Sequence, residues 1–235
     1  RIFKAYDKKA ERWIAFARLL KTDCPEQYDP FLREARLTCS LTHPNIIPVY
    51  DLGLDANGQP FFAMELKTGK TLNEFRQDNC QQEQLNILLT TFLKACDAIT
   101  YSHSKNVLHL DLKPENVHVG QFGEVHVCDW GLSHVIGSLN NSVNNEHDIL
   151  DPDLMNVVSV NARIKGTPGY MAPELLQDKN KASFATDIYG LGALLHFLLC
   201  GQAPLSGSFN DICKKTLTGE IDSLKSIDKH IPDSL

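Results

Sequence analysis

The residues whose types and spacing suggest chemistry lie between positions 109 and 131. Asp111 is followed by Lys113 two residues later and by Asn116 five residues later, and Asp129 comes thirteen residues after Asn116. Carboxylate and amide oxygens in small number suit Mg²⁺, which keeps several waters and shares its coordination shell with phosphates. A magnesium ion held by Asn116 and Asp129 would leave Asp111 free to accept a hydroxyl proton, with Lys113 near enough to neutralise a phosphate.

The segment that joins Asn116 to Asp129 has the pattern of a tight β-hairpin. Residues 117–119 and 125–127 each alternate valine with histidine, and residues 120–123 contain two glycines. Alternation of apolar and polar residues is typical of a strand with one buried face, and glycines favour the turn between two strands. The hairpin predicts that Asn116 at its entrance and Asp129 at its exit lie close together in space.

The stretch from residue 109 to residue 131 resembles the catalytic core of protein kinases. That family has the pattern H-R-D-L-x-x-x-N followed by D-F-G, and this sequence has H-L-D-L-K-P-E-N followed by D-W-G. Leu110 replaces the family's arginine, and Trp130 replaces its phenylalanine. One Asp and one Asn at this spacing occur often by chance, whereas the whole stretch with its K-P-E segment rarely does. The segment around D-W-G looks most like bacterial Ser/Thr kinases of the eukaryotic type.

The resemblance implies an enzyme that transfers the γ-phosphoryl group of ATP to a Ser or Thr hydroxyl of a protein substrate. ATP and Mg²⁺ would then be its cofactors. Asp111 would be the catalytic base, and Lys113 would stabilise the transferred phosphate. Asn116 and Asp129 would be the metal ligands.

Two later segments resemble further parts of the kinase large lobe. Residues 166–174, G-T-P-G-Y-M-A-P-E, are similar to the substrate-docking loop, and Thr167 matches the threonine that contacts the catalytic Asp and Lys in Ser/Thr kinases. Asp187 opens an apolar helix that Gly201 would cap at its C-terminal end. In the family, the acid at this position ties down the backbone of the catalytic loop. An ordinary helix N-cap is the alternative reading of Asp187, and both roles can hold together.

The N-terminal part resembles the second and third strands of the kinase small lobe. The predicted strands are residues 1–7 and 12–20, and the third-strand pattern V-A-I-K is replaced here by I-A-F-A. Ala17 therefore stands where the family has the lysine that binds the α- and β-phosphates. Successive strand side chains point to opposite faces, so Arg18 would point away from the nucleotide. Lys4, on the preceding strand, is also a poor substitute.

The resemblance implies a nucleotide pocket between the two lobes. Glu34 lies on a predicted helix over residues 31–37 and is the acid that normally pairs with the missing lysine, although helix pattern alone allows a solvated charge. Cys128 would line the floor of the pocket, or is simply a small buried residue. The residues that would contact the nucleotide are Ile2, Ala15, Glu34, Met64, Glu65, Leu66 and Cys128. Within this set, Met64 would guard the back of the pocket, and Glu65 and Leu66 would offer backbone groups to adenine.

The expected fold is α+β and two-lobed. A small β-rich lobe would span residues 1–66, a hinge residues 67–70, and a larger, mainly helical lobe residues 71–235. The resemblance implies that this kinase-like domain is incomplete at both ends, with the glycine-rich loop before residue 1 and the last two helices after residue 235. It allows for a sensor or a transmembrane region elsewhere in the protein. A long polar segment rich in Asn and Ser is expected around residues 140–145.

Composition limits the other function classes. The 235 residues carry a net charge of −6 and no long run of Lys or Arg, so nucleic acid is not an expected partner. The longest apolar run, residues 188–200, falls short of the roughly 20 residues that a membrane span needs. The seven cysteines include no C-x-x-C pair, which favours reduced thiols and a cytoplasmic location.

Two functions therefore remain open. The first is an active Ser/Thr protein kinase, favoured by Asp111, Lys113, Asn116 and Asp129. The second is a pseudokinase, a nucleotide-binding or protein-binding regulatory module, favoured by Ala17.

Overall fold

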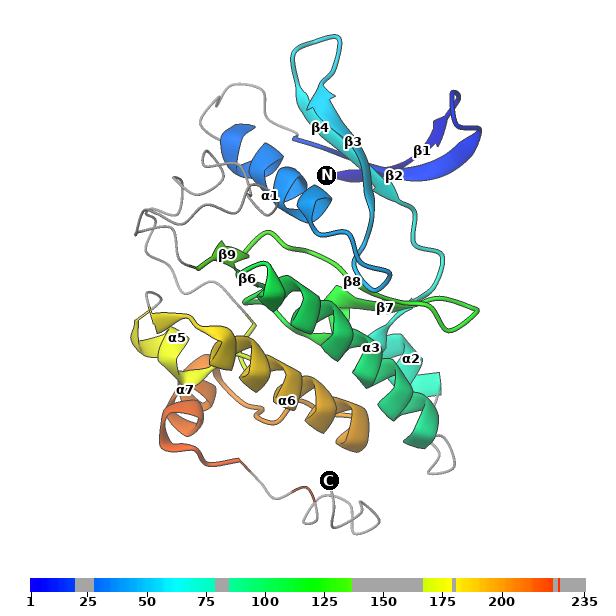
Figure 1. The fold of residues 1–235 in the computed structure, drawn as a ribbon. Helices are drawn as coiled ribbons and strands as arrows, with labels where there is room; N and C mark the ends of the chain where they lie inside the picture. The colour runs from blue at the N-terminus through cyan, green and yellow to red at the C-terminus, as the bar shows by residue number, and fades with distance from the viewer. Residues whose placement is uncertain (20–27, 79–84, 137–166, 179–180, 222–223, 225–235) are drawn as a thin grey trace.

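The computed structural model describes residues 1–19, 28–78, 85–136, 167–178, 181–221 and 224, except for the side chains of residues 29 and 30. The Asn-rich stretch at 140–145 lies outside the described residues. A small sheet with one helix beside it forms the N-terminal part, and a larger, mainly helical part follows (Figure 1). This arrangement confirms the predicted two-lobed α+β fold. The exact limits proposed for the hinge remain a prediction.

The N-terminal part contains one antiparallel sheet with the strand order β1-β2-β4-β3. Its elements are β1 (Ile2–Asp7), β2 (Arg12–Arg18), α1 (Tyr28–Ser40), β3 (Val49–Leu54) and β4 (Pro60–Glu65). Ile2 pairs with Ala17, and Ala15 pairs with both Lys4 and Met64. Because directly paired residues share a face of the sheet, Ile2, Ala15, Ala17 and Met64 face the same side.

Small residues allow α1 to pack closely against this face. Ala35 of α1 is fully buried, and Ala17 is 3% exposed beside it, with Phe62 in the same cluster. The ring of Phe31 lies 5.0 Å from that of Phe62, measured between centroids. Since a well-packed core resists displacement, this contact fixes the position of α1 relative to the sheet.

The larger part is built around two long helices that lie side by side, α3 and α6 (Figure 1). Its helices are α2 (Leu72–Asp78), α3 (Leu85–Ser104), the short 3-10 helix η3 (Pro114–Asn116), α5 (Pro173–Gln177), α6 (Phe184–Cys200) and α7 (Phe209–Thr218). Its strands are β5 (Lys70–Thr71), β6 (Val107–Leu108), β7 (Val117–Val119), β8 (Val125–Val127) and β9 (His134–Val135).

Helix α6 begins one turn earlier than the sequence pattern indicated. Ser183 occupies the N-cap position, and its backbone N–H donates to the hydroxyl of Thr186 at 3.0 Å. Asp187 therefore lies inside the first turn, and the N-cap interpretation of this residue is wrong. The predicted cap at the other end is confirmed, because Gly201 adopts the left-handed conformation with φ 74°.

The predicted hairpin is confirmed, and the structure adds a third segment to it. Val117 pairs with Val127 and Val119 with Val125, and all four side chains are buried. The backbone N–H of Val127 donates to the carbonyl oxygen of Asn45 at 2.8 Å, and that of Ile47 donates to Val127 at 3.2 Å. The loop after α1 is thereby tied to the strand that leads to Asp129.

Two glycines of α6 give a matched test of how closely this helix packs. A side-chain carbon on Gly190 would lie 3.0 Å from Cβ of Leu112, whereas one on exposed Gly192 would meet nothing within 4 Å. Overpacking costs about 1–3 kcal/mol. We expect Gly190→Val to lower the free energy of unfolding by this amount, and Gly192→Val to change it by less than about 0.5 kcal/mol. Urea denaturation measures both, and equal effects would contradict close packing at Gly190.

Candidate functional site

Asp111 lies at the centre of a set of polar contacts. Its carboxylate Oδ2 accepts hydrogen bonds from Nζ of Lys113 at 2.6 Å and from the amide nitrogen of Asn116 at 3.1 Å. Its Oδ1 accepts from the hydroxyl of Thr167 at 3.3 Å. Asn116 also donates to the backbone carbonyl of Asp111 at 2.9 Å. The fold thus brings together four residues that the sequence proposed for one site, although Thr167 is fifty-six residues from Asp111.

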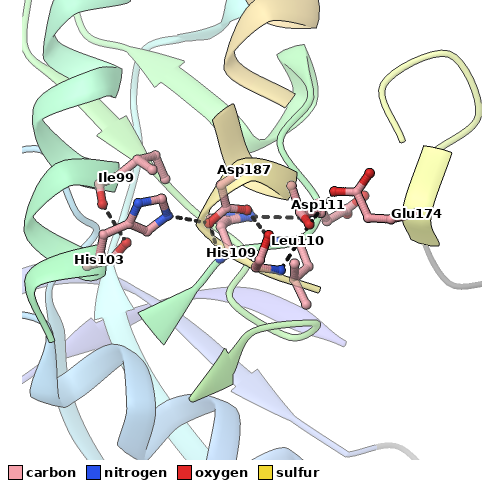
Figure 2. A network of polar contacts seen from close by, with 10 residues as sticks. Ile99, His103, His109, Leu110, Asp111, Glu174 and Asp187 are labelled. Atoms are coloured by element: carbon pink, nitrogen blue, oxygen red, sulfur yellow. Dashed lines mark hydrogen bonds and ion pairs between the residues drawn. The ribbon is translucent and has the colours of Figure 1, made fainter. Parts of the chain in front are cut away.

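Asp187 of α6 holds the backbone of this loop through its carboxylate (Figure 2). Its carboxylate accepts the backbone N–H groups of His109 at 2.8 Å and of Leu110 at 2.9 Å, and contacts Nε2 of His103 at 2.8 Å. Asp187 is only 1% exposed. Burial of a carboxylate is unfavourable unless hydrogen bonds replace those that it made to water. The three contacts therefore compensate for the burial of Asp187. They also restrain Leu110, whose φ of 65° is unusual for a residue other than glycine.

His109 links the Asp111 loop to the Asp129 loop. Its Nδ1 accepts the backbone N–H of Asp111 at 3.2 Å, and its Nε2 lies 3.1 Å from the carbonyl oxygen of Cys128. Burial lowers the pKa of His109, so the ring is neutral at pH 7. The proton then belongs on Nε2, which donates to Cys128. The ring also packs on Trp130, with centroids 4.6 Å apart. His109 is therefore a packed, hydrogen-bonded histidine.

Asp129 is exposed and adopts a positive φ of 61°. A side-chain carbon on Gly131 would lie 3.2 Å from Oδ1 of Asp129 and 3.1 Å from Oε2 of Glu34. The two carboxylates therefore face each other across Gly131. Burial, together with the nearby negative charge of Asp129, raises the pKa of Glu34 from 4.5 to about 7.

No lysine or arginine in the described residues replaces the family's third-strand lysine beside Glu34. Arg18 is directed away from the cleft and pairs with Asp55 at 3.5 Å. Nζ of Lys4 lies 4.6 Å from the centre of the Trp13 ring, on the side of Ala15 away from Ala17. The direction of Arg18 agrees with the strand alternation, whereas Lys4 pairs with Ala15 and shares its face of the sheet, but contacts the Trp13 ring there.

The predicted nucleotide-contacting residues come from both sides of the hinge. Ile2, Ala15 and Met64 share the face of the sheet that also carries Ala17, and on this face Ile2 is 60% exposed and Ala15 is buried. Glu65 ends β4, and its carboxylate accepts a hydrogen bond from Nζ of Lys67 at 2.9 Å. Leu66 follows directly and is half-buried.

Cys128 is half-buried directly before Asp129. Burial raises the pKa of Cys128 to about 12, and its thiol lies 3.6 Å from the carbonyl oxygen of His126. A thiol in this setting is protonated and poorly reactive at pH 7.

The residues proposed for Mg²⁺ fit that ion by their chemistry. Asn116 donates through its amide nitrogen, which leaves its side-chain oxygen available as a ligand. From the described residues, the carboxylate of Asp129 accepts one long hydrogen bond, of 3.4 Å, from the backbone of Gly131. Within the described ranges, no three His, Cys, Asp or Glu side chains form a closed metal site. Mg²⁺ in phosphoryl-transfer sites needs only one or two carboxylates together with substrate phosphates.

A family model for the protein kinase domain matches residues 1–233. The chain belongs to the protein kinase family. The serine/threonine-protein kinase PknD of Protochlamydia amoebophila (strain UWE25) is 33% identical over 241 aligned positions, which cover 93% of this chain and 23% of that protein. PknD of Chlamydia pneumoniae is 34% identical over 221 positions, covering 86% of this chain and 23% of its own length. This kinase domain thus spans less than a quarter of these bacterial relatives, and it is related to Ser/Thr kinases.

A solved structure shows the same fold at low sequence identity. A chain of the yeast RNA Pol II CTD kinase CTDK-1 complex matches this kinase domain with a TM-score of 0.68 and 20% identity. The match covers 91% of this chain and 63% of the other. None of the helices in the described part is long and apolar enough to cross a membrane.

Sequence reasoning missed two groups that position the site of the kinase domain. The amide of Asn45 donates to the carbonyl oxygen of Val125 at 2.9 Å, which helps to join the loop after α1 to β8. The hydroxyl of Thr186 donates to Glu174 at 2.6 Å and so ties α5 to α6. Asn45 lies eighty residues before Val125, and nothing in the sequence indicated which strand the loop after α1 would join.

The pKa of Glu34 predicts how stability depends on pH. A carboxyl whose pKa rises on folding binds its proton more tightly in the folded state, so stability falls as pH rises from about 4.5 to about 7. In EDTA, we expect Glu34→Gln to raise the free energy of unfolding by up to about 3 kcal/mol at pH 8 and by little at pH 4.5. Urea denaturation at the two pH values measures this. A gain of equal size at both pH values would show that ionisation of Glu34 does not cause the pH dependence of stability.

Proposed function

We propose that this domain transfers the γ-phosphoryl group of ATP to Ser or Thr hydroxyls of a protein substrate. The observation that carries the proposal is the Asp111 carboxylate, which Lys113, Asn116 and Thr167 hold in one orientation. A general base must be held within hydrogen-bond reach of the proton that it accepts. Membership of the protein kinase family supports the same conclusion.

In this reaction the oxygen of the substrate hydroxyl forms a bond to the γ-phosphorus, and Asp111 accepts the proton of that hydroxyl. The bond from that phosphorus to the β–γ bridging oxygen breaks, and ADP leaves. Lys113 places its ammonium group 2.6 Å from the Asp111 carboxylate, where it can also neutralise charge on the transferred phosphoryl group. Asn116 and Asp129 would hold Mg²⁺, which supplies positive charge to the phosphates. Thr167 keeps the carboxylate oriented and would lie beside the substrate.

We place adenine against the cleft-facing side of the sheet, between Ile2 and Ala15, with Met64 behind it. Glu65 and Leu66 would contribute backbone groups, and Cys128 would lie below. The small side chains of Ala15 and Ala17, which lie on one face of β2, support this placement because they leave room beside the sheet.

A second candidate is a pseudokinase that binds nucleotide or protein without turnover. The specific observation in its favour is Glu34, which has no lysine or arginine partner among the described residues because position 17 is alanine. Removal of one preorganised transition-state donor costs about 2.7–4 kcal/mol. A loss of this size slows an enzyme strongly without abolishing its activity, so we retain the proposal of an active Ser/Thr kinase.

We also propose a cytoplasmic location for this domain. In the described part of the chain, no disulfide involves Cys39, Cys96, Cys128, Cys200 or Cys213, as a reducing compartment favours. A sensor or membrane segment would lie in other parts of the protein, and its protein substrates would carry Ser or Thr.

Two carboxylate substitutions separate metal binding from base catalysis. We expect Asp129→Asn to abolish Mg²⁺-dependent binding of ATP, because Asp129 would contact the metal ion. We expect Asp111→Asn to retain this binding but to lower phosphoryl transfer by about 10²–10⁴. Calorimetry measures binding, and transfer of labelled phosphate measures activity. Equal loss of nucleotide binding in the two variants would contradict this division of roles.

Restoring the third-strand lysine tests whether the domain is a slowed enzyme. We expect Ala17→Lys to raise kcat/KM by about 10²–10³, because the new ammonium group would pair with Glu34 and contact the phosphates. Ala17→Met has a side chain of similar length without the charge and should give no gain. If Asp111-dependent transfer stays undetectable in folded wild-type and Ala17→Lys protein, the pseudokinase proposal is the one that stands.

A further inference from the structure

Glu34 and Asp129 form a pair of like charges, and no Lys or Arg from the described part of the chain lies between them. Oε2 of Glu34 and Oδ1 of Asp129 lie 3.1 Å and 3.2 Å from one common point, the place of a side-chain carbon on Gly131. Within the described residues, no Lys or Arg side chain contacts Glu34. Two carboxylates this close disfavour each other's ionised form unless a cation lies nearby.

Packing holds the pair together against this repulsion. Ala35, the neighbour of Glu34, is fully buried against the sheet, so α1 cannot turn without opening that contact. The loop after α1 is joined to Val127, two residues before Asp129, by backbone hydrogen bonds of 2.8 Å and 3.2 Å. The fold therefore presents both carboxylates to the same space, although their mutual charge opposes it.

We propose that Glu34 is an additional ligand, directly or through a coordinated water, of the divalent cation that Asp129 and Asn116 would hold. The inference rests on the proposed function for the presence of that cation. In this arrangement Glu34 binds a metal ion and not a lysine. The metal ion then supplies the positive charge beside Glu34 that the lysine supplies in other kinases. Carboxylate and amide oxygens are the ligands that Mg²⁺ and Mn²⁺ prefer.

Binding of Mn²⁺, followed by electron paramagnetic resonance of the free ion, tests the proposal without any need for turnover. The titration is done on the full chain, with and without a non-hydrolysable ATP analogue. We expect Glu34→Gln to weaken Mn²⁺ binding by about 10–100-fold, the range found when groups that support a metal site are removed. The matched control is Glu124→Gln, which removes a carboxylate at the tip of the β7–β8 hairpin and should leave Mn²⁺ binding unchanged.

The Ala17→Lys background supplies a second, independent readout. A lysine at position 17 would pair with Glu34 and withdraw it from the metal ion. In that background we expect Glu34→Gln to change Mn²⁺ affinity by less than about 3-fold, well below the 10–100-fold range. A circular dichroism melt of each variant confirms that it is folded.

The outcomes separate this inference from the proposed function. If Asp129→Asn weakens Mn²⁺ binding and Glu34→Gln does not, the role of Glu34 is overturned and the proposed metal site stands. If, with nucleotide present, the wild-type protein binds Mn²⁺ no better than Asp129→Asn does, the role of Glu34 and the proposed metal site are both overturned. Weakened binding in Glu34→Gln supports the inference even if the domain transfers no phosphate.

Discussion

The carboxylate of Asp187 is buried against the loop that carries Asp111, and the rest of the site depends on the three contacts that this carboxylate makes. Two of these contacts fix the backbone of His109 and Leu110, and the third comes from His103 on α3. A buried carboxylate without partners would be strongly unfavourable, so any movement of the loop away from α6 is opposed by the cost of leaving this charge unsatisfied. The left-handed conformation of Leu110 is held in place by the same contacts.

From this fixed loop, contacts extend to every other part of the site. The ring of His109 contacts the backbone carbonyl of Cys128, which precedes Asp129, and so links the two loops. Lys113 and Thr167 orient the carboxylate of Asp111. On the other side, backbone hydrogen bonds from the loop after α1 reach β8. The helix that carries Glu34 and the strand that leads to Asp129 are therefore parts of one connected structure. This connection explains how two carboxylates can be held face to face in a domain whose third strand lacks its lysine.

Local features of the fold could be predicted from the sequence, whereas contacts between distant segments could not. The valine–histidine alternation predicted β7 and β8 correctly, because strand periodicity depends only on neighbouring residues. Strand alternation also predicted that Arg18 would leave the cleft. The start of α6 was placed too late, since Ser183 and Thr186 form the cap, and their side chains are common in loops as well as at helix starts.

The sequence by itself determined the family, the two-lobed fold and the residues around Asp111, because these depend on motifs and on short-range periodicity. Only the tertiary structure decided that Asn45 joins β8, that Thr186 binds Glu174, and that Glu34 faces Asp129. Each of these contacts joins segments that are separate in sequence, and its geometry depends on how α1, α5 and α6 pack. The space beside Ala17 is the clearest case. The sequence showed that a lysine is missing there, and the packing of Ala35 against the sheet decided that a second carboxylate would remain beside Asp129 without a protein cation in the described part of the chain.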